Sequence, residues 1–227
     1  MNKHDLSTMK IFTGISETSL SALLNKGEMK RYKVAHQVFR DKEQVDTLYM
    51  VVSGIVSLYK INEHGQKRVI FMLGPGKMIN DVIIQDLPAS INCEAFEDAT
   101  LLCYQKVDFL EIMAQDFKLT QNVINSLAQK VRRMYRQLKN TNPSIKIEKR
   151  LAAKLWKLAK DHGVPHKDGT LINMTISITY VADLLGSQRE TISRAMKILT
   201  DNELVGSYNK KILIYNKQKL ADFFKAP

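Results

Sequence analysis

Apolar residues in the first half of the chain come in short runs that turn residues interrupt. Between residues 29 and 104 the runs are VAHQVF, TLYMVVSG, VSLYKI, KRVIFML, INCEAF and TLLCY. Several of the breaks between them fall at glycines: Gly54, Gly65, Gly74 and Gly76. Many short strands at even spacing are typical of an antiparallel sandwich or roll rather than a parallel sheet. The pattern therefore predicts a β-roll, with short helices before it over residues 9–25.

A helical period replaces the short runs from residue 117 onward. A single long helix is expected over 117–140, and it ends at Asn142-Pro143 because both positions disfavour helix. Its apolar positions step by four or three, as in a coiled-coil seam. They are Leu119, Val123, Leu127, Val131, Met134 and Leu138. The stripe either packs on the roll of the same chain or pairs with a second copy. We favour a homodimer seam, because so long a basic helix at a domain junction has little else to bury its stripe.

Beyond Pro143 the sequence predicts a helix over 147–159, a loop at HGVPHKDG and a strand over 171–176. The segment ITYVADLLGSQRETISRAMKIL, residues 178–199, then reads as two helices around a tight turn at Gly186. The first helix begins at Thr179 and buries Val181, Ala182, Leu184 and Leu185. The second opens at Ser187, has Glu190 in capping-box spacing, and buries Ile192, Met196 and Leu199. Residues 204–215 form a β-hairpin wing around a Ser207–Lys210 turn.

The second helix of this pair carries polar residues on its first two turns. In helix-turn-helix proteins these positions reach base edges in the major groove. Arginine suits guanine O6 and N7, and glutamate accepts from cytosine N4. An ordinary helical hairpin with solvated arginines, in which Glu190 only caps the helix, is the alternative. The expected DNA-contacting residues are Thr179, Ser187, Gln188, Arg189, Glu190, Ser193, Arg194 and Lys210.

The net charge of +11 is concentrated in the second half of the chain. Residues 1–117 hold 13 Lys and Arg against 15 Asp and Glu, whereas residues 118–145 hold 6 basic and no acidic residues. Residues 146–227 hold 15 basic against 8 acidic residues. A basic region around the predicted helix-turn-helix is typical of a protein that binds the phosphate backbone of DNA. A membrane-surface role is disfavoured, because no basic amphipathic segment carries opposed Trp or Phe.

Length and composition narrow the remaining classes. A chain of 227 residues accommodates two domains. No apolar run approaches the roughly 18–20 residues needed to span a membrane. The start, MNKHDLSTMKIF, lacks a signal-peptide core, and two cysteines suit a reducing compartment, so we expect a cytoplasmic protein.

Candidate chemistry for metals, cofactors or catalysis is sparse. Two thiols cannot hold an iron–sulfur cluster that needs four. Symmetric pairing about Asp98 puts Cys93 opposite Leu102, so Cys93 and Cys103 are expected on adjacent strands but opposite faces, as small core residues. The loop histidines His162 and His166 lack acid or thiol partners. An enzyme barrel would need a metal triad or paired carboxylates, and we find neither. We therefore expect no catalytic residues, no metal and no cofactor.

The order of these elements resembles the Crp/Fnr family of bacterial transcription regulators. The most specific segments are TLYMVVSG, HGQKRVIFMLGPGKMI and GSQRETISR. The resemblance implies an α+β protein: an N-terminal β-roll (a double-stranded β-helix or jelly roll) with flanking helices over 1–116, a long dimerisation helix and hinge over 117–142, and a winged helix-turn-helix domain over 143–227. It further implies a dimer that binds double-stranded DNA, with RNA polymerase as a partner and no catalytic activity.

The resemblance also carries an expected DNA site. Arg189, Glu190 and Arg194 match the base-reading positions of the Crp branch, which prefers TGTGA-like half-sites. Fnr-branch members usually lack the first arginine, so Arg189 favours the Crp type. Ser193 is shared with the Fnr branch, which leaves the outer bases of the site open.

The sensory positions depart from the cyclic-nucleotide members of the family. Those members carry Gly-Glu for the ribose and Arg-Ser for the phosphate, where this chain has Asn80-Asp81 and Ser90-Ile91. Without the arginine a buried phosphate would lack its charge partner, so we expect no cyclic AMP binding. The expected effector-pocket residues are Asn80, Asp81, Val82, Ile83, Ser90, Ile91, Arg132 and Tyr135. A more apolar small molecule is one interpretation. An effector-independent regulator whose roll is a scaffold or protein-docking surface is the other.

Overall fold

A computed structural model describes residues 3–140 and 145–226, with side chains described for 5–136 and 145–226. The chain divides into two compact units. The roll unit comprises residues 1–60 and 69–135, and the helix-turn-helix unit comprises residues 61–68 and 136–227. Within the described residues, no helix is both long and apolar enough to cross a membrane.

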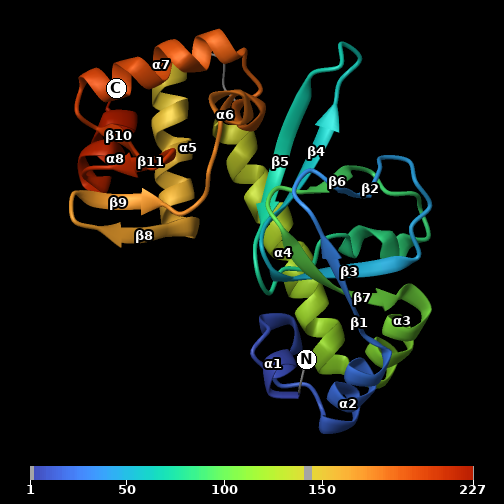
Figure 1. The fold of residues 1–227 in the computed structure, drawn as a ribbon. Coiled ribbons are helices and arrows are strands. Elements are labelled where there is room, and N and C mark those ends of the chain that lie inside the picture. The colour runs from blue at the N-terminus through green and yellow to red at the C-terminus, as the bar shows by residue number, and fades with distance from the viewer. Residues whose placement is uncertain (1–2, 141–144, 227) are drawn as a thin grey trace. The chain divides into compact units, whose positions relative to one another are not determined.

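The β-roll is built from two antiparallel sheets, with strand orders β1-β7-β3 and β2-β6-β4-β5 (Figure 1). This confirms the predicted roll. Each of the six apolar runs contributes a strand, and β1 adds an edge strand that the runs did not reveal, since its side chains are mostly exposed. The strands are β1 (Glu28–Tyr32), β2 (Gln37–Phe39), β3 (Thr47–Ser53), β4 (Val56–Ile61), β5 (Lys67–Leu73), β6 (Asn92–Ala95) and β7 (Ala99–Gln105).

Helices precede the strands of the roll, follow them, and interrupt them once between β5 and β6. They are α1 (Lys3–Ser7), η1 (Lys10–Phe12), α2 (Glu17–Lys26), the short 3-10 helix η2 (Asp81–Gln85), α3 (Lys106–Gln115) and the long α4 (Phe117–Asn140). Helices η1, α2 and α4 agree with the sequence prediction, whereas α1, η2 and α3 were not predicted. The junction between α3 and α4 is fixed by Asp116, whose carboxylate accepts hydrogen bonds from the Ser16 and Leu119 amides at 2.9 and 3.1 Å.

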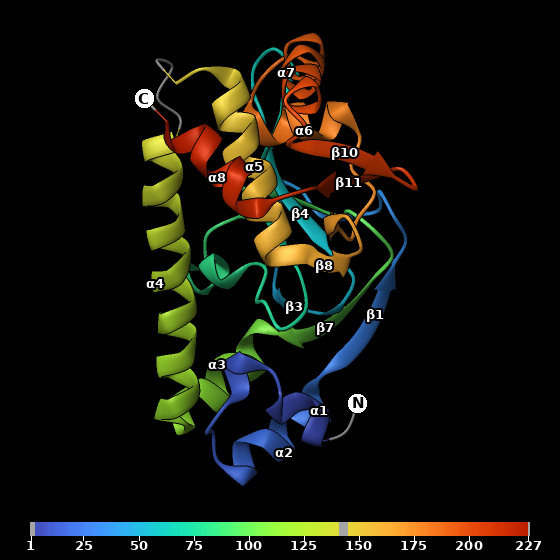
Figure 2. The ribbon, with the colours of Figure 1, turned by 90° about the vertical axis from the view of Figure 1, so that its left-hand side faces the viewer.

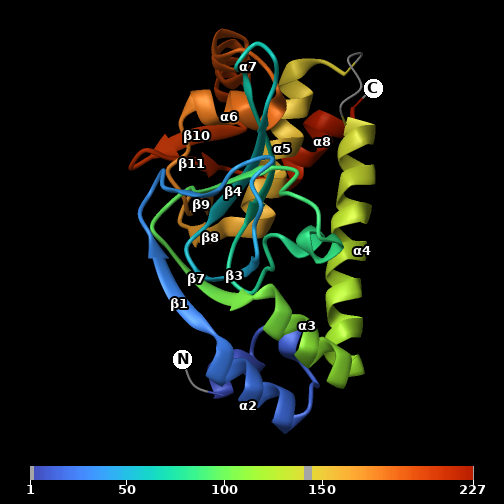
Figure 3. The same ribbon diagram turned by 90° about the vertical axis from the view of Figure 1, so that its right-hand side faces the viewer.

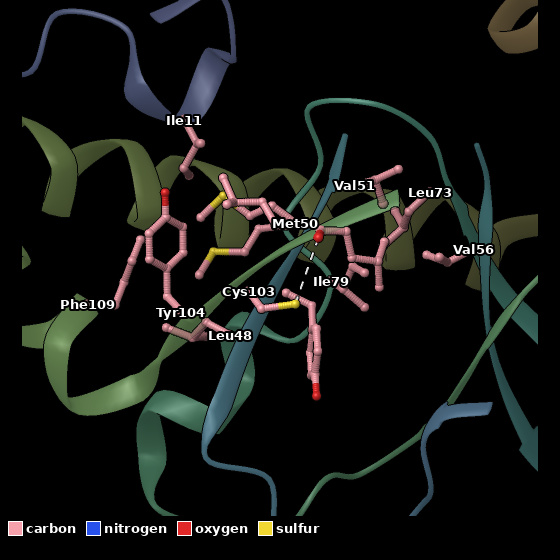
Figure 4. Packing of buried hydrophobic residues seen from close by; sticks show 14 of the residues in the cluster. Ile11, Leu48, Met50, Val51, Val56, Leu73, Ile79, Cys103, Tyr104 and Phe109 are labelled. Atoms are coloured by element: carbon pink, nitrogen blue, oxygen red, sulfur yellow. Dashed lines mark hydrogen bonds between the residues drawn. The ribbon is translucent and has the colours of Figure 1, made fainter. Parts of the chain in front are cut away.

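One apolar core fills the roll and extends under its helices (Figure 4). Tyr104 on β7 contacts Phe109 on α3 and Phe12 in η1, with ring centroids 5.4 and 6.4 Å apart. Leu119 and Val123 of α4 belong to the same core and are 0% and 1% exposed. The first half of α4 is therefore packed on its own chain.

The two cysteines lie in different sheets. Cys93 on β6 faces Phe39 and Leu58 in register, and Cys103 on β7 faces Glu28 and Tyr49. The predicted pairing of Cys93 with Leu102 is wrong, because β6 and β7 belong to separate sheets of the roll. Both thiols are buried and reduced, and burial raises their pKa values, that of Cys103 to about 11.

Over residues 145–226, the helix-turn-helix unit combines four helices with one antiparallel sheet of order β10-β11-β9-β8. The prediction of a loop at HGVPHKDG is wrong in part, because residues 163–166 form strand β8 and pair with β9. Helix α8 was not predicted from the sequence. The elements are α5 (Ile147–His162), β8 (Gly163–His166), β9 (Gly169–Ile172), α6 (Ile178–Leu185), α7 (Arg189–Asp201), β10 (Val205–Tyr208), β11 (Lys211–Ile214) and α8 (Lys217–Lys225).

Candidate nucleic-acid interface and effector site

Helix α6 begins and ends at residues that the local sequence dictates. Ser177 is the N-cap, and its Oγ accepts a hydrogen bond from the Tyr180 amide at 3.1 Å. Gly186 ends the helix with φ 60° and ψ 50°, the left-handed conformation that glycine adopts without steric cost. The predicted turn at Gly186 is confirmed, as is burial of Val181, Ala182, Leu184 and Leu185.

Helix α7 starts two residues later than the sequence predicted. The Ser187 amide still donates back to the Ala182 carbonyl at 3.1 Å, so Ser187 closes the turn and does not cap α7. Gln188 is the N-cap and makes no side-chain capping bond, so the predicted capping box of Ser187 and Glu190 is wrong. The core stripe also shifts, because Ala195 is buried together with Ile192 and Leu199, whereas Met196 is only half-buried.

The outer face of α7 presents the predicted base-reading residues. Arg189, Glu190, Ser193 and Arg194 are exposed on its first two turns, opposite the buried stripe. Lys197 is exposed as well and was missed, although its position one turn after Ser193 and Arg194 places it on the same face. Of the other predicted contacts, Thr179 and Gln188 are exposed, and Ser187 is partly exposed.

The wing is the hairpin of β10 and β11, which Figure 2 shows as a projecting ribbon in this unit. Asn209 and Lys210 form its tip with φ values of 48° and 61°, as a two-residue type I′ turn requires. Lys210 is exposed at the tip, as expected for a phosphate contact. A Cβ at Gly206 would lie 2.2 Å from the Tyr215 hydroxyl, so a larger residue there would displace the half-exposed Tyr215 side chain.

In the roll unit, Asn80 has a structural role. Its Oδ1 accepts from the Tyr49 amide at 2.9 Å, and its Nδ2 donates to the Thr47 carbonyl at 2.8 Å. Asn80 therefore ties the start of η2 to β3, and both ends of its amide are already used.

Asp81 is buried against the long helix. Its Oδ1 accepts from the Lys130 ammonium at 2.6 Å, and its Oδ2 accepts from the Ser126 hydroxyl at 3.3 Å. The Lys130 ammonium also donates to the Ile79 carbonyl at 3.2 Å. Burial lowers the pKa of Lys130 more than the attraction of Asp81 raises it.

Lys130 was not predicted from the sequence as a residue of this site, whereas Arg132 was. Arg132 is exposed, because it lies on another face of α4. Lys130 follows Val123 by seven residues, which is two helical turns, so the roll-facing stripe itself carried the signal.

The other expected pocket residues do not all face inward in this protomer. Ile83 is buried and Ile91 half-buried. Val82 and Tyr135 are 42% and 67% exposed, and Ser90 is exposed. That these eight residues line one effector pocket stays a prediction.

The six residues predicted to form the dimer seam differ in burial along α4. Leu119 and Val123 cannot contact a second chain, because they are buried in the roll core, and Leu127 packs partly against that core. Val131 and Met134 are 43% and 49% exposed, and Leu138 lies outside the residues whose side chains are described. The homodimer itself stays a prediction.

In the described part of the chain, no group of three or more His, Cys, Asp and Glu residues is placed to hold a metal ion.

Two family models match the chain in the order of its units. Residues 29–116 match the cyclic nucleotide-binding domain, and residues 149–223 match the Crp-like helix-turn-helix domain. The chain belongs to the Crp/Fnr family of transcription regulators. It is a DNA-binding transcription regulator, and its N-terminal domain is of the kind that binds effectors. The proteins to which it is similar are transcription regulators and not enzymes.

Relatives and solved structures support the assignment over nearly the whole chain. The CRP-like cAMP-activated global transcriptional regulator of Mycobacterium tuberculosis is 23% identical over 95% of this chain and 96% of its own length. The cAMP-activated global transcriptional regulator CRP of Salmonella typhimurium is 22% identical over 88% of this chain and 95% of its own. The fold is similar to that of FixK2 from Bradyrhizobium japonicum, at 19% identity, with a TM-score of 0.75 over 86% of this chain and 96% of that one. It is also similar to that of the c-di-GMP responsive global regulator CLP of Xanthomonas campestris, at 19% identity, with a TM-score of 0.77 over 88% of this chain and 100% of that one.

Proposed function

We propose that the protein acts as a homodimer that reads a TGTGA-like inverted repeat through α7. The observation that carries this proposal is the exposure of Arg189, Glu190 and Arg194 on the first two turns of α7, directly after the Gly186 turn. Each arginine can bond O6 and N7 of a guanine, and Glu190 can accept from a cytosine amino group. The other predicted contacts, including Lys210 at the wing tip, would hold the phosphates.

Dimerisation would give the two recognition helices their spacing. Two half-sites of an inverted repeat must be reached about one helical turn of DNA apart. The second half of α4 supports this proposal, because Ile124, Val131, Met134 and Tyr135 expose apolar surface in the protomer. Since the similar proteins are transcriptional regulators, we propose RNA polymerase as a further partner.

The effector of this protein would differ from cyclic AMP, although the similar regulators of Mycobacterium and Salmonella are cAMP-activated. By the resemblance to the cyclic-nucleotide members of the family, Asp81 takes the place of the ribose-binding glutamate, but it is 1% exposed and already paired with Lys130. Ser90 supplies no charge for a phosphate. One proposal is that the protein binds an apolar or aromatic effector. The closed pair of Asp81 and Lys130 favours the second, a regulator that needs no effector.

The test is DNA binding by single variants of α7 at fixed salt, because affinity for DNA depends strongly on ionic strength. We expect Arg189→Ala and Arg194→Ala each to lose about 1–3 kcal/mol at a TGTGA-like inverted repeat. Glu190→Ala should relax the preference at one base pair more than it weakens total binding. Lys219→Ala is the control, because it removes an exposed positive charge from α8 in the same unit. Unchanged sequence preference in all three α7 variants would refute the assignment.

A further inference from the structure

Within the roll unit, α4 has one face that packs and one that does not. Leu119, Val123 and Leu127 contact the roll, whereas Ile124 and Val131 are 57% and 43% exposed. Figures 2 and 3 both show α4 beside the short helix at residues 81–85 (η2). The rotation of α4 about its own axis therefore decides in which direction the exposed face points.

Apolar contacts alone fix such a rotation weakly, because hydrophobic burial is not directional. The packed face ends instead in a polar clamp with defined geometry. Lys130 lies 2.6 Å from the Asp81 carboxylate and 3.2 Å from the Ile79 carbonyl, and Ser126 lies 3.3 Å from the same carboxylate. The side chains of Asp81 and Lys130 are 1% and 18% exposed.

The clamp cannot be turned without a large electrostatic cost. Rotation of α4 would separate two charges that are both removed from water, and each would be left without its partner. One turn further along α4, the Arg133 guanidinium carbon lies 5.1 Å from the centre of the Phe71 ring on β5. Two consecutive turns of the helix are therefore held on the roll by directed contacts.

The clamp also uses the polar groups that a ligand would need. Asp81 occupies the position at which the resemblance places the ribose-binding glutamate, and the donors that it accepts from belong to α4 itself. An anionic ligand at Lys130 would have to displace Asp81 and leave that carboxylate buried without a partner.

We infer that Asp81 and Lys130 are positioning residues for DNA binding, and that their ion pair sets the rotation of α4 without a bound small molecule. That rotation directs the exposed face of α4 toward its mate, and the proposed dimer that binds both half-sites depends on it. The inference rests on the proposed function as a dimer that reads an inverted repeat.

The experiment compares binding to a full inverted repeat with binding to an isolated half-site, both without added ligand. Asp81→Asn keeps the size of the side chain and can still accept a hydrogen bond, so it is the variant that best preserves folding. Lys130→Met keeps the length of the stem and removes the charge. We expect each to lose at least tenfold in affinity for the full repeat at its native spacing, and to bind the half-site within twofold of the original protein.

Two further variants separate positioning from simple destabilisation. Lys130→Arg retains the positive charge and should bind the full repeat within about threefold of the original protein. Exchange of the two charges, Asp81→Lys with Lys130→Asp, should recover several-fold of the affinity that either neutral variant loses. Lys118→Met is the matched control, because it removes an exposed positive charge from the first turn of the same helix. It should leave both affinities unchanged.

The outcomes distinguish the inference from the proposed function. If the original protein does not prefer the inverted repeat to the half-site, the proposed function fails. If it does and both neutral variants retain the same preference, only the role of the ion pair is refuted. Tighter binding of the full repeat by the neutral variants would also overturn the inference, since the pair would then oppose DNA binding.

Discussion

The guanidinium of Arg150 on α5 donates a hydrogen bond to the carbonyl oxygen of Leu185, with an N–O distance of 2.8 Å. Leu185 is the last residue of α6, and its carbonyl belongs to the set that a helix cannot satisfy internally. Within the described residues, the Nε atom of Arg150 is buried without a hydrogen-bond partner. Arg150 thus anchors the end of α6 immediately before the Gly186 turn, which determines where α7 begins.

Replacement of Arg150 by alanine should destabilise the helix-turn-helix unit by about 1.5–3 kcal/mol, the usual contribution of a hydrogen bond to a charged group. The single tryptophan, Trp156, lies on α5 against Phe224 of α8, so its fluorescence during urea unfolding reports this unit. Lys157→Ala is the control, because its pair with Asp161 is a surface ion pair and contributes little. Equal unfolding midpoints for the two variants would contradict the anchoring role.

Gly54 and Gly76 offer a matched pair of substitutions in the roll. Their φ values are 77° and 75°, so alanine pays the same backbone cost of about 1–2 kcal/mol at either position. A Cβ at Gly54 would lie 2.3 Å from the Asp98 carbonyl oxygen, whereas nothing lies within 4 Å at Gly76. Urea unfolding followed by circular dichroism should show Gly54→Ala to be less stable than Gly76→Ala by a further ~1–3 kcal/mol. Similar unfolding midpoints for the two variants would show that the backbone at Asp98 moves away from residue 54 at little cost, which would contradict this prediction.

Asp116 makes the stability of the roll depend on pH. Desolvation raises the pKa of its carboxyl, but hydrogen bonds from Ser16, Ser19 and Leu119 outweigh it and lower the pKa to about 2. A depressed pKa stabilises the fold above the unfolded value of 3.8, and this stabilisation is lost as pH falls from there toward 2. Asp116→Asn should therefore cost up to about 2 kcal/mol at pH 6, and the difference from the original protein should shrink by pH 2.5. A difference that is independent of pH would refute the role of the charge.

The proposed dimer is tested at Val131 rather than at Leu127, since Leu127 packs partly on the roll. Val131→Asp would place a charge in the apolar contact between two copies of α4, so we expect a monomer by light scattering and weak binding to the inverted repeat. Asn125→Asp, at an exposed position of the same helix, should remain dimeric. An intact dimer for Val131→Asp would exclude this face of α4 as the seam.

Cyclic AMP should not bind at micromolar concentrations. The site lacks a cation for the phosphate at Ser90, the amide of Asn80 is occupied by β3, and Asp81 is buried in its own ion pair. Isothermal titration and operator binding, with and without the nucleotide, provide the measurement. A micromolar dissociation constant, or a gain in operator affinity, would overturn the interpretation of these three positions.

The sequence by itself determined the features that depend on neighbouring residues. The period of apolar positions identified most strands of the roll and the helices around Gly186, because backbone propensity and one-sided burial leave a local trace. The positive φ at Gly186 and the polar face of α7 were likewise readable, since both follow from residues a few positions apart. The start of α7 was misplaced by two residues, because Ser187 was needed to close the turn.

Only the tertiary structure decided which distant groups meet. The apolar stripe on α4 indicates that this side of the helix is buried, but it does not identify the surface that buries it. In the structure the roll buries Leu119 and Val123 and leaves Val131 exposed. The sequence could not place Cys93 and Cys103 in separate sheets. Only three residues separate β6 from β7, but each strand pairs with strands far away in the sequence, and such pairing leaves no local signal. The contact of Asp81 with Lys130, 49 residues apart, arises in the same way, because burial brings together two charges that neither segment could satisfy alone.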